Sequence, residues 1–353
     1  MPIDCNPGQG REGEDPSIYL RVQRNFAYEW YVIKADSKTP QADEKLLTPV
    51  LPKSPKHLWY SGCGVIGSTI YVVGGEDNDN SLNDDVYYID TRRPSGGWKK
   101  GCSMKKPRSH PYSLTVDRKL YVLGSTFDPA NLHDEPPYAE AFDERESRWT
   151  ELPADMDPLP SLICGHAVLD NPKRFLFHSQ GFPSLYYYHI DSDSWGVFSE
   201  STLDFGGKNT SALVDGILYC LDYRHPGFMF GLDVSNPGNK LQKVLGFDKD
   251  IKEKKPLPQP DSPHSNTGPR GFLVPMGNSK LAVLWAGMLP RRVHRLRALE
   301  PDKEEAKLLV SYSILNMYKQ PNATTGGVDF VAETLSVSYY NVLGSKLNNC
   351  LPV

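Results

Sequence analysis

The sequence lacks the signatures by which most enzymes and many binding proteins are recognised. It contains no G-x-S-x-G nucleophile motif, no H-E-x-x-H zinc helix and no phosphate-binding G-x-x-x-x-G-K loop. It has no excess of basic residues, since the formal net charge is -4, and a protein without a positive field is poorly suited to a phosphate backbone. No apolar run is long enough to cross a bilayer. These absences argue against a nucleic-acid or membrane partner.

Cysteines are few and are not arranged for metal binding or disulfide formation. The six cysteines lie far apart and form no Cys-x-x-Cys pair, a distribution typical of reduced intracellular thiols. The first 16 residues are polar and acidic, where a secretory signal needs a basic start and an apolar run. We therefore expect residues 1–16 to be a disordered tail and the protein to lie in the cytoplasm, the nucleus or both.

What the sequence does contain is abundant turn chemistry and many aromatic residues. There are 30 prolines, 29 glycines and 19 tyrosines in 353 residues. This mixture favours short strands joined by tight turns over long helices. The sequence therefore predicts an all-β fold.

One hairpin pattern occurs three times. Each copy has an aromatic or branched run that ends in aspartate, then a polar turn, then a tryptophan that begins the next extended segment; the copies are VYYIDTRRPSGGW, FDERESRW and YYYHIDSDSW. The tryptophans are Trp98, Trp149 and Trp195, and their spacing of 51 and 46 residues lies close to a repeat period of ~50 residues. The pattern predicts a repeat architecture, with each tryptophan wedged between neighbouring repeats.

The repeats resemble those of the kelch family, in particular plant kelch-repeat proteins. The resemblance covers residues 57 to 235 and is carried by a glycine doublet, a pair of tyrosines and the tryptophans, namely Gly74, Gly75, Tyr87, Tyr88, Trp98, Trp149 and Trp195. It implies a β-propeller of four-stranded blades. Many plant kelch proteins carry an F-box ahead of the propeller, but the first 56 residues lack the apolar helical run that an F-box needs.

Counting repeats predicts a six-bladed kelch-type β-propeller spanning residues 17–342. Five blades are expected at 57–105, 106–157, 160–204, 207–248 and 270–318. We expect the last blade to be closed by an N-terminal hairpin, 17–36, paired with C-terminal strands within 327–342, because pairing the chain ends removes exposed sheet edges. Residues 249–269, charged and then proline-rich, are expected to form a mobile loop, and residues 343–353 a C-terminal tail.

Candidate binding residues lie where the chain enters the inner strand of a blade. Pro-Arg pairs place Arg108 and Arg270 at similar positions in the second and fifth blades, and His110 and His166 lie early in theirs. Arginines fixed on one face would suit an acidic peptide or a carboxylate-bearing ligand. The alternative is that such an arginine satisfies backbone carbonyls at a blade junction.

The sequence therefore predicts a monomeric interaction module that binds a protein or peptide partner on one propeller face. The alternative is a small-molecule-binding or enzymatic propeller of plant specialised metabolism, which would use the channel mouth. The chain also resembles the plant specifier proteins, iron-dependent kelch enzymes, by fold, but the acidic and histidine ligand pattern of that family is not found here. We expect no cofactor and no metal.

Overall fold

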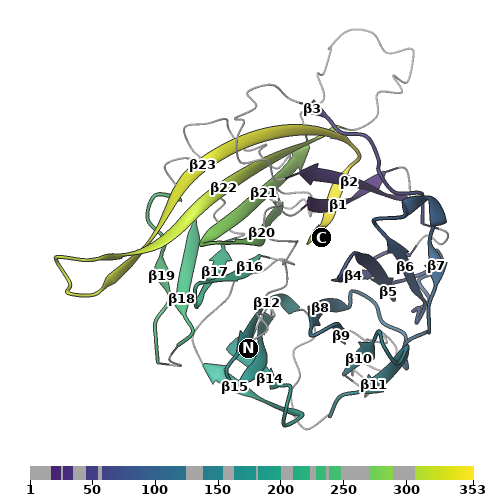
Figure 1. The fold of residues 1–353 in the computed structure, drawn as a ribbon, viewed down its shortest axis with the longest axis horizontal. Helices are drawn as coiled ribbons and strands as arrows, with labels where there is room; N and C mark the ends of the chain where they lie inside the picture. The colour runs from purple at the N-terminus through teal and green to yellow at the C-terminus, as the bar shows by residue number, and fades with distance from the viewer. Residues whose placement is uncertain are drawn as a thin grey trace.

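The computed structural model forms a ring of small antiparallel sheets around a central axis (Figure 1). It describes residues 17–24, 27–34, 45–54, 58–124, 138–153, 163–179, 182–199, 210–222, 228–235, 238–247, 270–288 and 307–353. The predicted tail 1–16 and the predicted mobile loop 249–269 lie outside these residues. In these residues nearly all the regular structure is β-strand, and a short 3-10 helix, η1 (Pro94–Gly96), follows β6.

The first three blades follow one another along the chain, each as a four-stranded sheet. The first comprises β4 (Gly62–Ile66), β5 (Thr69–Val73), β6 (Val86–Asp90) and β7 (Lys99–Lys100). The second comprises β8 (Tyr112–Val116), β9 (Lys119–Leu123), β10 (Ala139–Asp143) and β11 (Arg148–Glu151). The third comprises β12 (Ile163–Asp170), β13 (Lys173–Ser179), β14 (Phe182–His189) and β15 (Ser194–Ser199).

The remaining blades depart progressively from this plan. The fourth comprises β16 (Ser211–Val214), β17 (Ile217–Leu221), β18 (Met229–Asp233) and β19 (Gln242–Lys243). The fifth comprises β20 (Arg270–Gly277), β21 (Lys280–Met288), β22 (Lys307–Pro321) and β23 (Val328–Leu343), with β3 (Lys45–Leu46) added to its outer edge. The sixth has the order β2-β1-β24, from β1 (Ser17–Arg24), β2 (Ala27–Lys34) and β24 (Lys346–Pro352). The predicted six-bladed propeller is confirmed.

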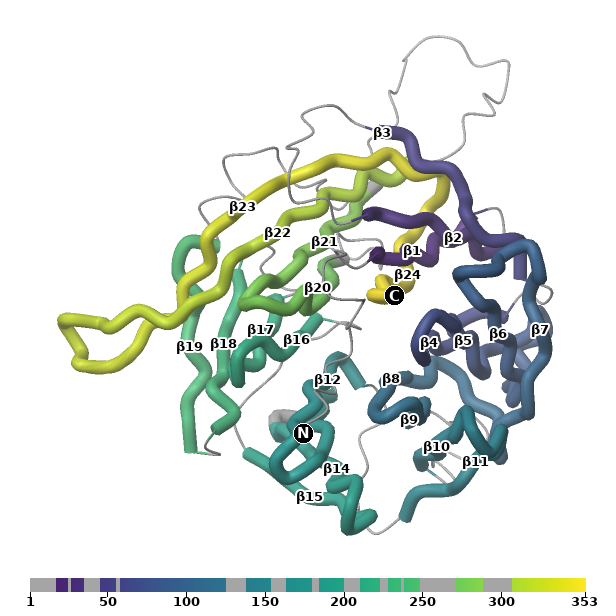
Figure 2. Tube along the Cα trace, in the orientation of Figure 1, coloured from purple at the N-terminus to yellow at the C-terminus, as the bar shows by residue number. Residues whose placement is uncertain are grey.

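Six inner strands surround the axis. β4, β8, β12, β16, β20 and β24 each contact the inner strand of the next blade, and the contact between β24 and β4 completes the ring. The tube in Figure 2 shows the same closure, with the C-terminus next to the axis. The second strand of a blade lies between two strands of its own sheet and is covered by neighbouring blades, which explains why Ile70–Val73 of β5 is buried throughout.

The ring closes between the chain ends, but not through the predicted C-terminal strands. β1 pairs with β24, from Ile18 opposite Pro352 to Gln23 opposite Lys346. The segment predicted for this role forms β23 instead, the outer partner of β22 in the fifth blade. Residues 343–353, predicted as a tail, therefore supply the inner strand of the sixth blade, whose backbone hydrogen bonds link the two ends of the chain.

The repeated tryptophans lock neighbouring blades together, as predicted. Each indole N–H donates to a backbone carbonyl in the stretch that leaves the preceding blade. Trp98 reaches Pro52 at 2.8 Å, Trp149 reaches Cys102 at 2.9 Å, and Trp195 reaches Pro153 at 2.6 Å. The copy FDERESRW, residues 142–149, therefore belongs to the structural joint between blades.

Candidate functional site

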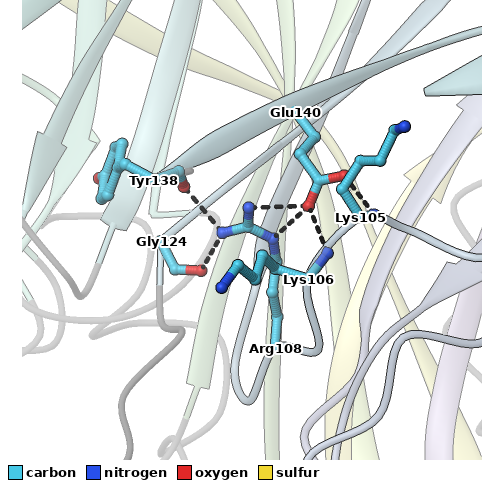
Figure 3. A network of polar contacts seen from close by, with 6 residues as sticks. All are labelled: Lys105, Lys106, Arg108, Gly124, Tyr138 and Glu140. Atoms are coloured by element: carbon cyan, nitrogen blue, oxygen red, sulfur yellow. Dashed lines mark hydrogen bonds and ion pairs between the residues drawn. The ribbon is translucent and has the colours of Figure 1, made fainter. Parts of the chain in front are cut away.

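The predicted binding residue Arg108 is buried. It lies in the loop between β7 and β8, and both its side chain and that of Glu140, on β10, are 0% exposed. The guanidinium donates to the Glu140 Oε1 from Nη2 at 2.9 Å and from Nε at 3.3 Å. Its Nη1 donates to the carbonyls of Gly124 and Tyr138 at 3.1 and 2.8 Å (Figure 3).

Backbone amides of the β7–β8 loop also donate to both carboxylate oxygens of Glu140. The backbone amides of Lys105 and Lys106 donate to Oε2 at 2.6 Å and to Oε1 at 3.2 Å, as Figure 3 shows. The expectation that Arg108 is offered to a ligand is therefore wrong, because the guanidinium is enclosed and used to join the blade entry to the strands of the second blade. This arrangement matches the alternative role at a blade junction.

The backbone of Arg108 continues this joint into the first blade. Its carbonyl accepts from the Gly75 amide at 2.7 Å, and its amide donates to the Asn83 carbonyl at 3.0 Å. Gly74 and Gly75 have φ values of +59° and +105°, which only glycine adopts readily. A Cβ on Gly75 would lie 2.4 Å from the Trp59 carbonyl, so the glycine doublet is required where the loops meet.

The other markers of the first blade are structural as well. Tyr87 is buried, and its hydroxyl reaches the Asp85 carboxylate at 3.4 Å. Tyr88 stacks on Tyr71 with ring centroids 5.7 Å apart.

Arg270 is the first residue of β20, opposite Ala286 of β21. The structure thus places its backbone at the entry to the inner strand of the fifth blade, as predicted, but its side chain lies outside the described part. A binding role for Arg270 stays a prediction.

His110, two residues ahead of β8, has an unusual backbone conformation. Its ring stacks on that of Tyr60, with centroids 4.0 Å apart and planes 18° from parallel. Both residues have positive φ, +50° and +55°, a region that costs energy for non-glycine residues and that concentrates at functional sites. Tyr60 is 45% exposed, so one member of the stack faces solvent.

Polar contacts with Ser109 and Glu76 hold the His110 ring of the stack in place. The Ser109 Oγ contacts the His110 Nδ1 at 2.7 Å and donates to the Glu76 carboxylate. Ser109 is buried, and Glu76 pairs with Trp59 through two backbone hydrogen bonds of 2.8 and 2.9 Å. The histidine is therefore fixed by groups from both adjoining loops.

Further aromatic residues extend the stack toward the sixth blade. Trp59 packs edge-on against Tyr28, with ring centroids 6.4 Å apart. The Arg21 guanidinium lies 3.7 Å from the Tyr28 ring centroid and donates to the Ser61 Oγ at 2.7 Å. We call Tyr28, Trp59, Tyr60 and His110 the mouth row; it spans the sixth, first and second blades.

A small pocket opens beside the mouth row between β24, β4 and β8. It is lined by Ser61, Gly62, Cys63, Pro111, Tyr112, Ser113 and Asn349 and has ≈ 250 Å³ of empty space with its open side included. Ligand pockets are usually about 300–1,000 Å³ and mainly apolar. The enclosed part of this pocket is ≈ 10 Å³, space for about one water molecule, and its lining is mainly polar. This pocket is therefore too small for a typical ligand.

His166 lies deeper in the channel wall and is already engaged. It is half-buried on β12, and its Nδ1 is 2.7 Å from the Tyr112 hydroxyl. The enclosing protein removes solvation and lowers the pKa of His166 to about 4. The imidazole is neutral at physiological pH, and the structure does not bring it together with Arg108 or His110 in one polar network.

A further histidine, His178 on β13, is fully buried and was not predicted. Its Nε2 is 3.2 Å from the Ser211 Oγ across the joint between the third and fourth blades. Burial lowers its pKa to about 4, with a smaller contribution from His166. A histidine inside the run RFLFHSQG could have been noted as buried and polar, but its partner lies 33 residues away and is found only through the blade packing.

Sequence reasoning also missed Tyr60, Ser109 and Glu76. Tyr60 lies two residues ahead of β4, as His110 lies two residues ahead of β8, and this equivalence could have identified it; Glu76 follows the glycine doublet. Among the described residues, no group of three or more histidine, cysteine or acidic side chains could hold a metal ion. In the same residues no helix is long and apolar enough to span a membrane.

Comparison with known proteins agrees with the architecture. The kelch motif model matches residues 60–103, the first blade and its joint. An F-box/kelch-repeat protein of Arabidopsis thaliana is 29% identical over 147 residues, 40% of this chain and 34% of the relative. A putative F-box/kelch-repeat protein of the same plant is 22% identical over 319 residues, 78% of this chain and 66% of the relative.

A vertebrate protein is also similar. Kelch-like protein 25 of Xenopus tropicalis is 28% identical over 178 residues, 47% of this chain and 28% of the relative. The chain spans about a third of the length of the first curated relatives, with 34%, 38% and 35% covered. The chain therefore carries a kelch motif on a six-bladed ring and is similar to plant F-box/kelch-repeat proteins.

Proposed function

We propose that the chain is an interaction module that binds a protein segment at the mouth row. The observation that carries this proposal is the exposed Tyr60 ring stacked on His110 at 4.0 Å. Kelch-repeat propellers generally serve as protein-interaction modules, and exposed loop residues on a rigid scaffold are where such proteins bind.

The loops that carry the Tyr60–His110 stack are fixed by hydrogen bonds and an ion pair, which favours a binding role for the exposed Tyr60 ring. The stack lies on loops joined by Glu76, Ser109 and the buried Arg108 network. A partner therefore loses little free energy in ordering this surface, which is the usual benefit of preorganisation. Aromatic side chains add contact area at low entropic cost, and interface cores are enriched in tyrosine.

The chemistry of the surface changes the expected partner. Because Arg108 is buried and paired, it no longer argues for an acidic peptide. The β5–β6 loop beside the stack has no lysine or arginine and five acidic residues: Glu76, Asp77, Asp79, Asp84 and Asp85. We propose a partner segment that offers an apolar or cationic side chain to the Tyr60 ring, since cations are attracted to aromatic faces.

The small-molecule alternative is less well supported. The pocket beside the mouth row is small and polar, and the arginine assigned to ligand binding is enclosed. The cytoplasmic or nuclear location, plant origin and monomeric state remain predictions from the sequence.

The test compares affinity capture by the wild-type chain and a Tyr60→Asn, His110→Asn variant from the native tissue. Asparagine tolerates positive φ, so this variant removes both rings while keeping the backbone. Val197→Thr is the matched control, because Val197 is 51% exposed on β15 of the third blade.

The proposal expects a protein that wild type and Val197→Thr retain and the double variant loses. Identical captures by all three, with unchanged melting temperatures, would contradict it. A retained metabolite that the double variant releases, with no protein lost, would favour the small-molecule alternative.

A further inference from the structure

A second exposed surface lies on the outside of the ring, away from the mouth row. β22 and β23 form a ribbon of 15 and 16 residues, longer than any other strand described, and Figures 1 and 2 show it passing along the outside of the fourth blade. Within it Tyr318 pairs with Val331, and Val331 forms a parallel bridge with Leu245, just after β19. Directly paired residues share a face of a sheet, so these three side chains form one row across three segments.

This row faces solvent. Tyr318 is 41% and Leu245 is 45% exposed, and Leu335 further along β23 is 49% exposed. Large apolar side chains grouped on a surface mark interaction sites more often than scattered ones do. We call Tyr318, Val331, Leu245 and Leu335 the outer row.

The opposite face of the ribbon is already used. Phe330 and Met317 are buried in the core of the fourth and fifth blades, and a Cβ on Gly231 would lie 2.6 Å from the Phe330 ring. Lys319 on this inner face forms an ion pair of 2.9 Å with Asp233 of β18. The ribbon is therefore fixed to the fourth blade, and the outer row cannot turn inward to bury itself.

One charge that has no partner among the described residues lies within the outer row. Glu333 is exposed between Val331 and Leu335 along β23 and sits opposite Asn316 of β22. It forms no ion pair or hydrogen bond with any described residue. The lysine nearest in the chain to Leu245, Lys243, lies over the Phe228 ring at 4.4 Å.

We propose that the outer row docks an extended partner segment that carries an arginine between apolar residues. The arginine pairs with Glu333 through a forked, charge-assisted contact. Tyr318 lies on the diagonal from Glu333, within reach for such a side chain, so its ring stacks on the same guanidinium. The flanking apolar residues cover Leu245 and Leu335.

The charge distribution selects this occupant over a second copy of the chain. Two copies that met face to face through the outer row would bring two Glu333 carboxylates into one apolar contact, and burying an unpaired charge is costly. A partner with a basic group in an apolar segment pairs with the Glu333 carboxylate and also covers the exposed apolar side chains.

The test uses synthetic nine-residue peptides labelled for fluorescence anisotropy. The probe has a central arginine between two leucine-valine pairs; the matched peptides replace the arginine by glutamate, or the four apolar residues by serine. They are titrated against the full chain, Glu333→Arg, a Tyr318→Ser, Leu245→Ser variant and the control Val197→Thr.

We expect the arginine peptide to bind wild type and Val197→Thr alike, and both outer-row variants at least about tenfold more weakly. Glu333→Arg should prefer the glutamate peptide, a reversal that a folding defect cannot produce. Equal binding of all three peptides, no binding, or a dimer in sedimentation that Tyr318→Ser, Leu245→Ser dissolves would each overturn the proposal. The Tyr60→Asn, His110→Asn variant should bind the probe normally, which separates this surface from the mouth row.

Discussion

Replacing Arg108 with alanine should destabilise the propeller strongly, because it breaks a fully buried ion pair. The variant leaves the Glu140 carboxylate, 0% exposed, with only the amides of Lys105 and Lys106 as donors. Removing one partner of a buried pair costs about 3–5 kcal/mol. The Gly124 carbonyl also loses its side-chain donor, which adds about 1 kcal/mol. We expect a loss of about 4–6 kcal/mol in the free energy of unfolding.

The measurement is urea unfolding followed by tryptophan fluorescence, with Arg148→Ala as control. Arg148 forms an ion pair of 2.8 Å with Glu146, but the two side chains are 68% and 58% exposed, so its loss should cost below about 1 kcal/mol. Arg108→Lys should be intermediate, because lysine keeps the charge but not the fork that reaches Glu140 and two carbonyls. If Arg108→Ala and Arg148→Ala differ by less than about 1 kcal/mol, the buried joint is not what stabilises the blade entry.

Two further predictions concern the joint between the third and fourth blades. Burial lowers the pKa of His178 to about 4 from an ordinary value of 6.5, so below pH 6.5 the unfolded chain takes up the proton first. The contribution of neutral His178 to the free energy of unfolding should be fully present above pH 6.5 and fall by about 3 kcal/mol as the pH drops to 4. Urea unfolding at several pH values should show a shallower decline for His178→Gln than for wild type. The same pH dependence in both proteins would refute this assignment. Gly165→Ala should cost about 1–3 kcal/mol by overpacking, because its Cβ would lie 1.8 Å from the Ser211 Oγ. Ser211→Gly should restore part of the lost melting temperature, and a neutral Gly165→Ala would show that β12 and β16 are not packed this closely.

Much of the fold follows from the sequence because each blade repeats the same local chemistry. Trp98, Trp149 and Trp195 occupy equivalent positions, and each donates to a carbonyl leaving the preceding blade. The glycine doublet marks a loop that only positive φ can form. Such features recur at a fixed period, so they can be predicted without knowing any long-range contact.

The inner strand of the sixth blade could not be recognised in the same way. β24 reads KLNNCLP, with two adjacent asparagines and a proline, a weaker strand pattern than that of an inner strand such as β12, ICGHAVLD. Asn349 is 9% exposed and lines the mouth pocket, a setting in which a polar residue is tolerated beside an apolar strand. β23 has the stronger strand pattern, yet it is the outer strand of the fifth blade.

The candidate site depends still more on tertiary contacts. The sequence identified His110 and Arg108 as neighbours at a blade entry. It did not show that the His110 ring stacks on an exposed tyrosine while the Arg108 guanidinium is buried. Glu140 is 32 residues from Arg108, and Tyr60 is 50 residues from His110. Both pairings arise from the packing of separate strands and loops, for which a single sequence carries no local signal.

Photo-crosslinking from position 60 tests the central claim most directly. Benzoylphenylalanine in place of Tyr60 puts the reactive group on the exposed ring of the mouth row, and the same residue in place of Val197 provides the control on β15. We predict that irradiation in extracts of the native tissue yields a discrete protein adduct from position 60 that is absent from position 197 and is lost when His110→Asn is added. The same adducts from both positions, or none from position 60, would contradict binding at the mouth row.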